Sequence, residues 1–238
     1  MKKFIIITAL ILGVLFIFSA TSVFAQYAYF GVKAGVNLSY AYGDNSDAAS
    51  WAWDPADKKP KIGFVGGVYS TIVLAKVFAI QPELLFTMQG IKWAHEDPAL
   101  DWEDHQIFKL NYIQLPVLLK FYFPMPGNVK INLFAGPYAA YNVSSKWEQW
   151  IAVMGVPVVD DEGDIDEDWT WDGFPIETRK FDYGAVFGLG VDFIIFGDKQ
   201  LTVDARFNLG LANFFKAEPA EDPAIKNATF SAMVGFGF

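Results

Sequence analysis

The stretch NATFSAMVGFGF, from Asn227 to Phe238, decides the fold class of this chain. Apolar residues alternate with small or polar residues along all of it, which is the period-two pattern of a β-strand. A soluble domain usually ends in a polar, frayed segment, so a regular strand at this position needs a partner. We expect it to close a sheet by pairing with the first strand, which would remove both free edges.

Residues 1–25 have the features of a cleaved signal peptide. Two lysines and an apolar run from Phe4 to Phe18 precede a stretch of small residues that ends at Ala25. Cleavage after Ala25 would leave one domain over residues 26–238. The alternative is an uncleaved anchor helix, but the apolar run is shorter than the about 20 residues that span a bilayer.

The composition of the chain limits its partners and its chemistry. It has 238 residues, a net charge of −9, 53% hydrophobic residues and no cysteine. An acidic exported protein is a poor partner for nucleic acid, whose phosphates require a basic surface. Without cysteine it forms no disulfide and has no thiol chemistry. Beyond the signal peptide no apolar run could span a membrane as a helix, so a closed β-barrel is the membrane fold that remains.

Period-two alternation recurs in eight segments, and an even number of strands suits a single-chain bacterial barrel. These segments are residues 28–41, 61–74, 77–93, 107–123, 129–145, 177–196, 200–215 and 227–238. The sequence predicts short turns after the second, fourth and sixth segments, and long loops over 42–60, 94–106, 146–176 and 216–226. Outer-membrane barrels carry short turns on the periplasmic rim and long loops outside, so we expect the termini to be periplasmic.

Volume decides which face of each strand lies inside. The interior of an eight-stranded barrel is just wide enough for its own side chains. The face rich in Phe, Leu, Ile and Tyr is too bulky for it, whereas the face rich in glycine and small polar residues fits. We therefore expect the apolar face to contact outer-membrane lipid.

Alternation places four charges of each sign inside. They are Lys33, Lys120, Lys130 and Arg206 with Glu83, Asp182, Asp192 and Asp204. Buried charges are costly unless they are paired, so we expect a salt-bridge network that largely plugs the lumen. The alternative is a path for protons or ions.

All eight tryptophans are expected in the long loops or at the strand ends beside them. They are Trp51, Trp53, Trp93, Trp102, Trp147, Trp150, Trp169 and Trp171. Tryptophan favours the boundary between membrane and water, which predicts a girdle at the outer rim. The tryptophans farther from the strands could instead bind a surface glycan or a protein partner.

Several strand sequences resemble those of the PorT-like outer-membrane β-barrel domain family of Bacteroidetes-type bacteria. They are YFGVKAGVNLSY, IQPELLFTMQG, LNYIQLPVLLKFYF and NLFAGPYAAY. The resemblance implies a bacterial outer-membrane location, and the family's name implies an accessory role in protein secretion. It supplies no catalytic residue. The terminal aromatic strand, with Phe236 and Phe238, also resembles the signal that outer-membrane barrel assembly machinery recognises.

Two acidic segments are candidate metal sites. The carboxylates between Asp160 and Asp172 suit calcium, but their spacing does not fit a calcium-binding loop. His95 and His105 lie among carboxylates, yet their spacing matches no known zinc site. A solvated surface segment without metal or cofactor is the preferred interpretation of both.

The sequence gives no sign of an enzyme. It lacks a nucleophile elbow and a phosphate-binding glycine loop. We therefore predict an all-β, eight-stranded, antiparallel, up-and-down transmembrane barrel with a structural or interaction role in its outer loops. The alternatives are a narrow channel, a secretion accessory component and a soluble lipocalin-like carrier.

Overall fold

The computed structural model describes most of residues 26–238. The described residues are 27–43, 58–97, 101–123, 125–165, 170–171, 174–175, 177–195, 199–213, 215–216 and 225–238. The predicted signal peptide lies outside them, so its cleavage stays a prediction. None of the helical residues in these ranges forms a helix long and apolar enough to cross a membrane.

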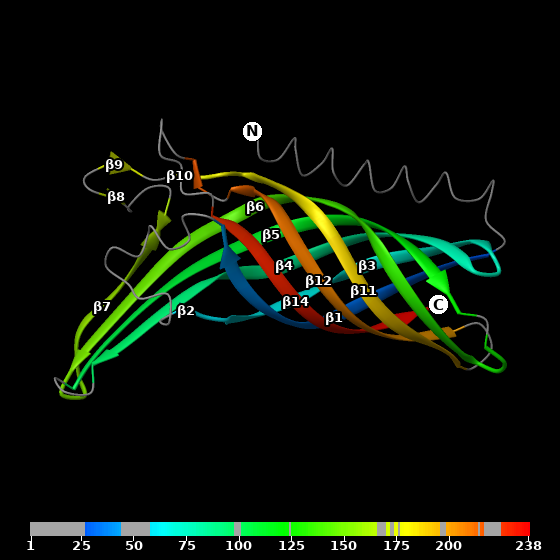
Figure 1. Cartoon of the computed structure of the whole chain (residues 1–238), viewed down its shortest axis with the longest axis horizontal. Coiled ribbons are helices and arrows are strands. Elements are labelled where there is room, and N and C mark those ends of the chain that lie inside the picture. The colour runs from blue at the N-terminus through cyan, green and yellow to red at the C-terminus, as the bar shows by residue number, and fades with distance from the viewer. Residues whose placement is uncertain are drawn as a thin grey trace.

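Eight antiparallel strands form a closed ring, which confirms the predicted fold class (Figure 1). Their order around the ring is β1-β3-β4-β5-β6-β11-β12-β14, with β11 paired to β6 and β14 paired to β1. The ring strands are β1 (Tyr27–Tyr42), β3 (Lys61–Ala75), β4 (Phe78–Asp97), β5 (Trp102–Tyr122), β6 (Val129–Val153), β11 (Phe181–Ile195), β12 (Lys199–Asn213) and β14 (Lys226–Gly237). The remaining strands are β2 (Lys58–Lys59), β7 (Val156–Asp164), β8 (Thr170–Trp171), β9 (Phe174–Pro175), β10 (Glu177–Thr178) and β13 (Phe215–Lys216).

The seam between β1 and β14 closes the ring. The two strands pair in unbroken antiparallel register from Gly31↔Gly237 to Tyr42↔Lys226. Beyond that register, the N–H of Phe30 donates to the carbonyl of Phe238 at 3.1 Å, and the N–H of Phe238 donates back at 2.7 Å. The alternating stretch that ends the chain is therefore the closing strand.

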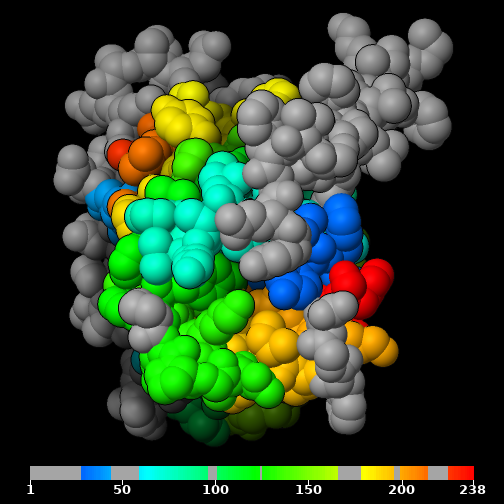
Figure 2. Space-filling model, turned by 90° about the vertical axis from the view of Figure 1, so that its right-hand side faces the viewer, coloured from blue at the N-terminus to red at the C-terminus, as the bar shows by residue number. Residues whose placement is uncertain are grey.

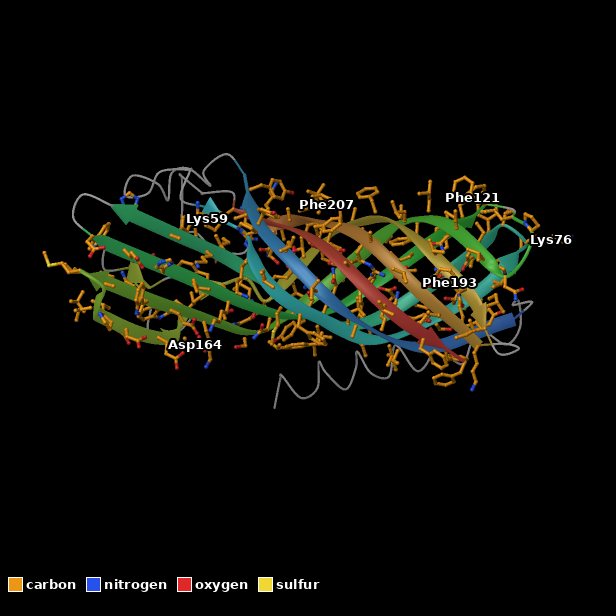
Figure 3. All side chains as sticks on the ribbon, turned by 90° about the horizontal axis from the view of Figure 1, so that it is seen from below. Lys59, Lys76, Phe121, Asp164, Phe193 and Phe207 are labelled. Atoms are coloured by element: carbon orange, nitrogen blue, oxygen red, sulfur yellow. The ribbon has the colours of Figure 1, made fainter. Side chains whose placement is uncertain are left out.

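One face of the ring strands is apolar and exposed and the other is polar and buried, as expected from the small volume of the barrel interior. On β1, Val32 and Val36 are 54% and 56% exposed, whereas Lys33 and Asn37, the residues that follow them, are buried. Many large apolar side chains of the other strands also point away from the ring, as Figure 3 shows for Phe121 and Phe207. The exposed apolar face and the buried polar face are the reverse of a soluble barrel.

Glycine makes room inside the ring for aromatic side chains. A Cβ at Gly188 would collide with the Phe134 ring, and one at Gly184 would come within 2.7 Å of the Tyr138 ring. The interior is thus filled by rings that lie over glycines, in addition to the small polar residues expected from the sequence.

Two of the predicted long loops are wrong, because the strands continue through them. β4 and β5 stay paired to Asp97↔Trp102, and β6 runs to Val153, turns at Met154 and Gly155 and returns as β7. These strands project from one end of the ring (Figure 1), and we call β7 together with residues 91–97, 102–109 and 146–153 the outer sheet. Both of its faces carry polar residues, so the apolar contrast that reveals a strand fades there.

Replacing Gly188 by valine should overfill the interior beside Phe134. We expect Gly188→Val to lower the free energy of unfolding by about 1–3 kcal/mol, the usual cost of overpacking. The matched control is Leu189→Val on the outward face, where Leu189 is 54% exposed. Urea unfolding of both variants in lipid vesicles measures the difference, and an equal loss in the two would contradict the filled interior.

Candidate functional site: the filled interior and the outer sheet

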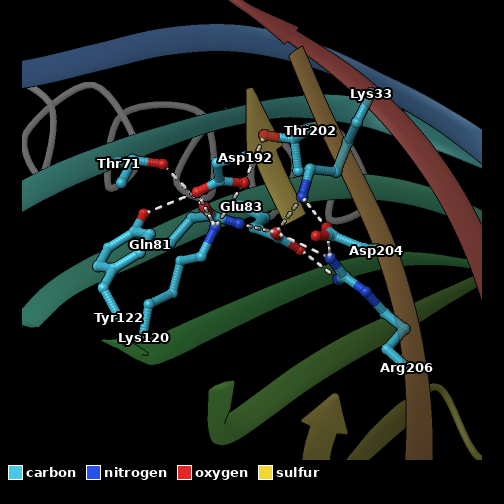
Figure 4. Close-up of polar contacts among 10 residues, drawn as sticks. All are labelled: Lys33, Thr71, Gln81, Glu83, Lys120, Tyr122, Asp192, Thr202, Asp204 and Arg206. Atoms are coloured by element: carbon cyan, nitrogen blue, oxygen red, sulfur yellow. Dashed lines mark hydrogen bonds and ion pairs between the residues drawn. The ribbon is translucent and has the colours of Figure 1, made fainter. Parts of the chain in front are cut away.

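Four charges form a closed cluster in the middle of the ring (Figure 4). Lys33 Nζ lies 2.8 Å from Glu83 Oε1 and 2.7 Å from Asp204 Oδ2. Arg206 Nη1 lies 2.6 Å from Glu83 Oε2, and Arg206 Nη2 lies 2.8 Å from Asp204 Oδ2. All four side chains are essentially inaccessible to solvent. Each charge therefore has two partners of opposite sign.

A second group lies nearer the short turns. Asp192 is 3.1 Å from Lys120 Nζ, and its two oxygens accept hydrogen bonds from Tyr122 at 2.9 Å and from Thr202 at 2.9 Å. Gln81 joins this group to the first one, because it donates to Glu83 at 2.6 Å and accepts from Lys120 at 3.2 Å. The interior charges thus form one continuous network (Figure 4).

Gln81 was not singled out from the sequence, although the alternation that marks Glu83 also places it inside. The pairings themselves required the register of strands that are far apart in the chain. Lys33 and Asp204, for example, are separated by 171 positions.

Two of the charges expected inside have other environments. Asp182 is buried, but it accepts a hydrogen bond from the Tyr138 hydroxyl at 3.0 Å. Lys130 is half-buried, with its Nζ 6.0 Å from the centroid of the Tyr122 ring.

An apolar cluster fills the ring toward the outer sheet. Trp93 and Phe108 pack edge to face at 5.3 Å, and Ile165 and Ile225 join them fully buried from the segments after β7 and before β14. The predicted interfacial or loop position is therefore wrong for Trp93, which is 8% exposed. Trp147 packs partly buried against the same cluster.

The lumen is filled at two levels, one ionic and one apolar. Figure 2 views the barrel from its short-turn end, where described residues of the N-terminal, middle and C-terminal parts of the chain lie side by side. Charges that are locked in mutual pairs are not free to exchange with a passing ion, and an apolar constriction resists hydration. This arrangement can hold the barrel rigid.

The inner face of the outer sheet carries a buried carboxyl group. Asp104 is 5% exposed and lies opposite His95 in the register. Burial raises the pKa of the Asp104 carboxyl above its ordinary value, against the opposing effects of a hydrogen bond with Gln149 and of nearby histidines. This carboxyl keeps its proton to a higher pH than a surface aspartate does.

The opposite face of the outer sheet carries aromatic and charged groups side by side. The rings of His105 and Trp150 are 5.3 Å apart, and Lys109 pairs with Glu148. On the inner face, Trp102 packs edge to face with His95 at 5.4 Å. Trp51, Trp53 and Trp169 lie outside the described residues, as does the side chain of Trp171.

The described residues of the two candidate metal sites do not converge in space, and Asp166, Glu167, Asp168 and Asp172 of the acidic segment lie outside the described ranges. His105 pairs with Ala94, so His95 lies on the opposite face of the sheet and the two imidazoles cannot share a zinc ion. Asp160 to Asp164 belong to β7, where successive carboxylates point to opposite faces. Across the described ranges, no three His, Cys, Asp or Glu side chains are arranged to hold a metal ion.

Comparison with known proteins assigns the chain to a family. A family model described as outer membrane protein beta-barrel domain matches residues 12–216. A comparison with curated proteins gives no match. Similar solved structures include Ail, the attachment invasion locus protein of Yersinia pestis, with 11% identity over 90% of this chain and 100% of that chain at a TM-score of 0.36.

Two further solved structures are similar at the same level. Neisserial surface protein A has 14% identity over 90% of this chain and 100% of that chain at a TM-score of 0.42. Outer membrane protein W of E. coli has 13% identity over 90% of this chain and 99% of that chain at a TM-score of 0.38. Similarity at this level says nothing about function.

Removing one charge from the interior cluster should leave its partners unpaired. We expect Glu83→Gln to lower the free energy of unfolding by about 3–5 kcal/mol, because Lys33 and Arg206 would then share one carboxylate while both remain buried. The control is Glu148→Gln, which removes a carboxylate from a partly exposed pair worth about 1 kcal/mol. Urea titration in lipid vesicles compares them, and a small effect of Glu83→Gln would count against the network.

Proposed function

Because this chain belongs to the outer membrane protein β-barrel domain family, we propose that it is a non-conducting barrel that presents the outer sheet at the cell surface. The family places the protein in the bacterial outer membrane, in contact with outer-membrane lipid. The proposal adds an orientation, a closed lumen and a binding role for the outer sheet.

The observation that carries the proposal is the paired and buried interior. A conducting pore needs mobile charges or water along its axis, whereas Lys33, Glu83, Asp204 and Arg206 hold one another across the ring. The apolar cluster around Trp93 and Phe108 adds a second block. Both features favour a binding or structural role over the alternative of a narrow channel.

The apolar belt has the length of one bilayer crossing. On β1 its members run from Phe30 to Tyr40 at every second position, which matches the about 9–11 residues of a tilted membrane-spanning strand. The outer sheet extends beyond this belt and carries most of the described acidic residues outside the ring. Its polar surface suits water, and its aromatic and acidic groups suit a protein or a glycan.

The orientation follows from the unequal ends of the barrel. The turns at one end are short, and the outer sheet and long connections lie at the other, as in outer-membrane barrels whose long segments face outward. Phe236 and Phe238 lie on the lipid-facing side of the closing strand, 36% and 66% exposed, where assembly machinery could bind them. The secretion role implied by the PorT-like resemblance stays a prediction.

Cysteine labelling tests this orientation, because the chain has no cysteine of its own. We expect Val158→Cys on β7 to react with a membrane-impermeant maleimide in intact cells, since Val158 is 58% exposed. The matched variant Lys76→Cys, at the tip of the β3–β4 turn (Figure 3), should react only after the outer membrane is permeabilised. The reverse pattern would place the outer sheet in the periplasm and contradict the proposal.

A further inference from the structure

β7 is the outermost strand of the outer sheet, and one of its edges is free of any strand that the structure describes. It pairs with β6 from Val153↔Val156 to Lys146↔Asp164, and no other strand in the described part of the chain pairs with it. Its residues from Val156 to Glu162 are all exposed. A free edge presents backbone N–H and C=O groups, to which an extended segment can add as a further strand.

The charge of β7 selects among the strands that could add to this edge. Asp160, Asp161 and Glu162 are consecutive, and within the described residues no basic side chain pairs with any of the three. Edge-to-edge pairing of two copies would bring these acidic segments together, and like charges on neighbouring strands are destabilising. The edge therefore disfavours a second copy of this chain and favours a basic strand.

The face beside this edge is hollowed and aromatic. The register sets Asp160 opposite Trp150 and Glu162 opposite Glu148, so these side chains share one face with His105. Together with Ile107, Gln149 and Asp161 they line an open hollow of about 460 Å³ at this edge. A lysine or arginine on an added strand would lie beside Asp160 or Glu162, with its cation within reach of the Trp150 ring.

We propose that the free edge of β7 binds an extended polypeptide segment that carries basic residues at alternate positions. The backbone groups of the edge pair with the segment, its basic side chains contact Asp160 and Glu162 on one face, and its other side chains lie beside Val159 and Asp161 on the opposite face. A glycan could not supply the strand pairing. This inference rests on the proposed function, because a partner must reach the outer sheet from outside the cell.

The test uses the purified full chain in lipid nanodiscs and a nine-residue peptide of alternating lysine and valine. Fluorescence anisotropy of the labelled peptide should show saturable binding, whereas a peptide of alternating glutamate and valine should not bind. The same lysine peptide, N-methylated at every second residue in either register, keeps its charge but loses backbone donors. At least one of the two methylated peptides should bind more than tenfold more weakly.

Two double variants, each of which removes two negative charges, test where on the outer sheet the peptide binds. Asp160→Asn with Glu162→Gln should weaken binding by about three- to tenfold, the value of two exposed ion pairs. Asp97→Asn with Asp101→Asn removes two carboxylates from the β4–β5 end of the outer sheet, away from Asp160 and Glu162, and should leave binding unchanged.

Each contrary result overturns the inference. Absence of binding, binding of both N-methylated peptides as tight as that of the unmethylated peptide, or equal effects of the two double variants would show that β7 is not a strand-pairing site. Concentration-dependent dimers that the Asp160 and Glu162 variant strengthens would identify a second copy as the occupant instead. Because the nanodisc exposes both sides of the barrel, this result is independent of the labelling that tests orientation.

Discussion

The requirement that every backbone hydrogen bond be satisfied within lipid governs this structure. No water is available in the bilayer to pair with a free strand edge, so the sheet must close on itself. The mutual hydrogen bonds of Phe30 and Phe238 complete that closure. Closure in turn sorts the side chains: bulky apolar groups face lipid, and every charge turned inward must find a partner. The cluster of Lys33, Glu83, Asp204 and Arg206 is the consequence.

Outside the lipid, water can pair with free backbone groups, so the outer sheet does not have to close into a ring. There β4, β5 and β6 leave the ring and continue as an open sheet, whose edges can be solvated. β2 pairs with β4 at Lys58↔Trp93 and Lys59↔Lys92, while β7 remains unpaired along its outer edge among the described strands. Water can solvate the backbone groups of that edge, and the acidic residues of β7 disfavour its pairing with the same edge of a second copy of the chain.

The ring could be predicted from the sequence because each ring strand has one face toward lipid and the other toward a packed interior. That contrast gave the number of strands, their direction around the ring and the face that carries Lys33 or Arg206. It failed at Asp97 to Trp102 and at Val153 to Val156, because strands with water on both sides have no apolar contrast. The pairing of Lys33 with Asp204 and the burial of Trp93 and Ile165 depend on register and on packing between distant segments, which alternation does not encode.

The central claim is that paired charges and an apolar cluster close the lumen, and conductance in a planar lipid bilayer tests it most directly. The full chain, inserted from detergent and shown to be folded by its resistance to SDS before boiling, should produce no stable ohmic current steps in potassium chloride. Reproducible single-channel steps from the folded protein would show an open lumen and contradict the account.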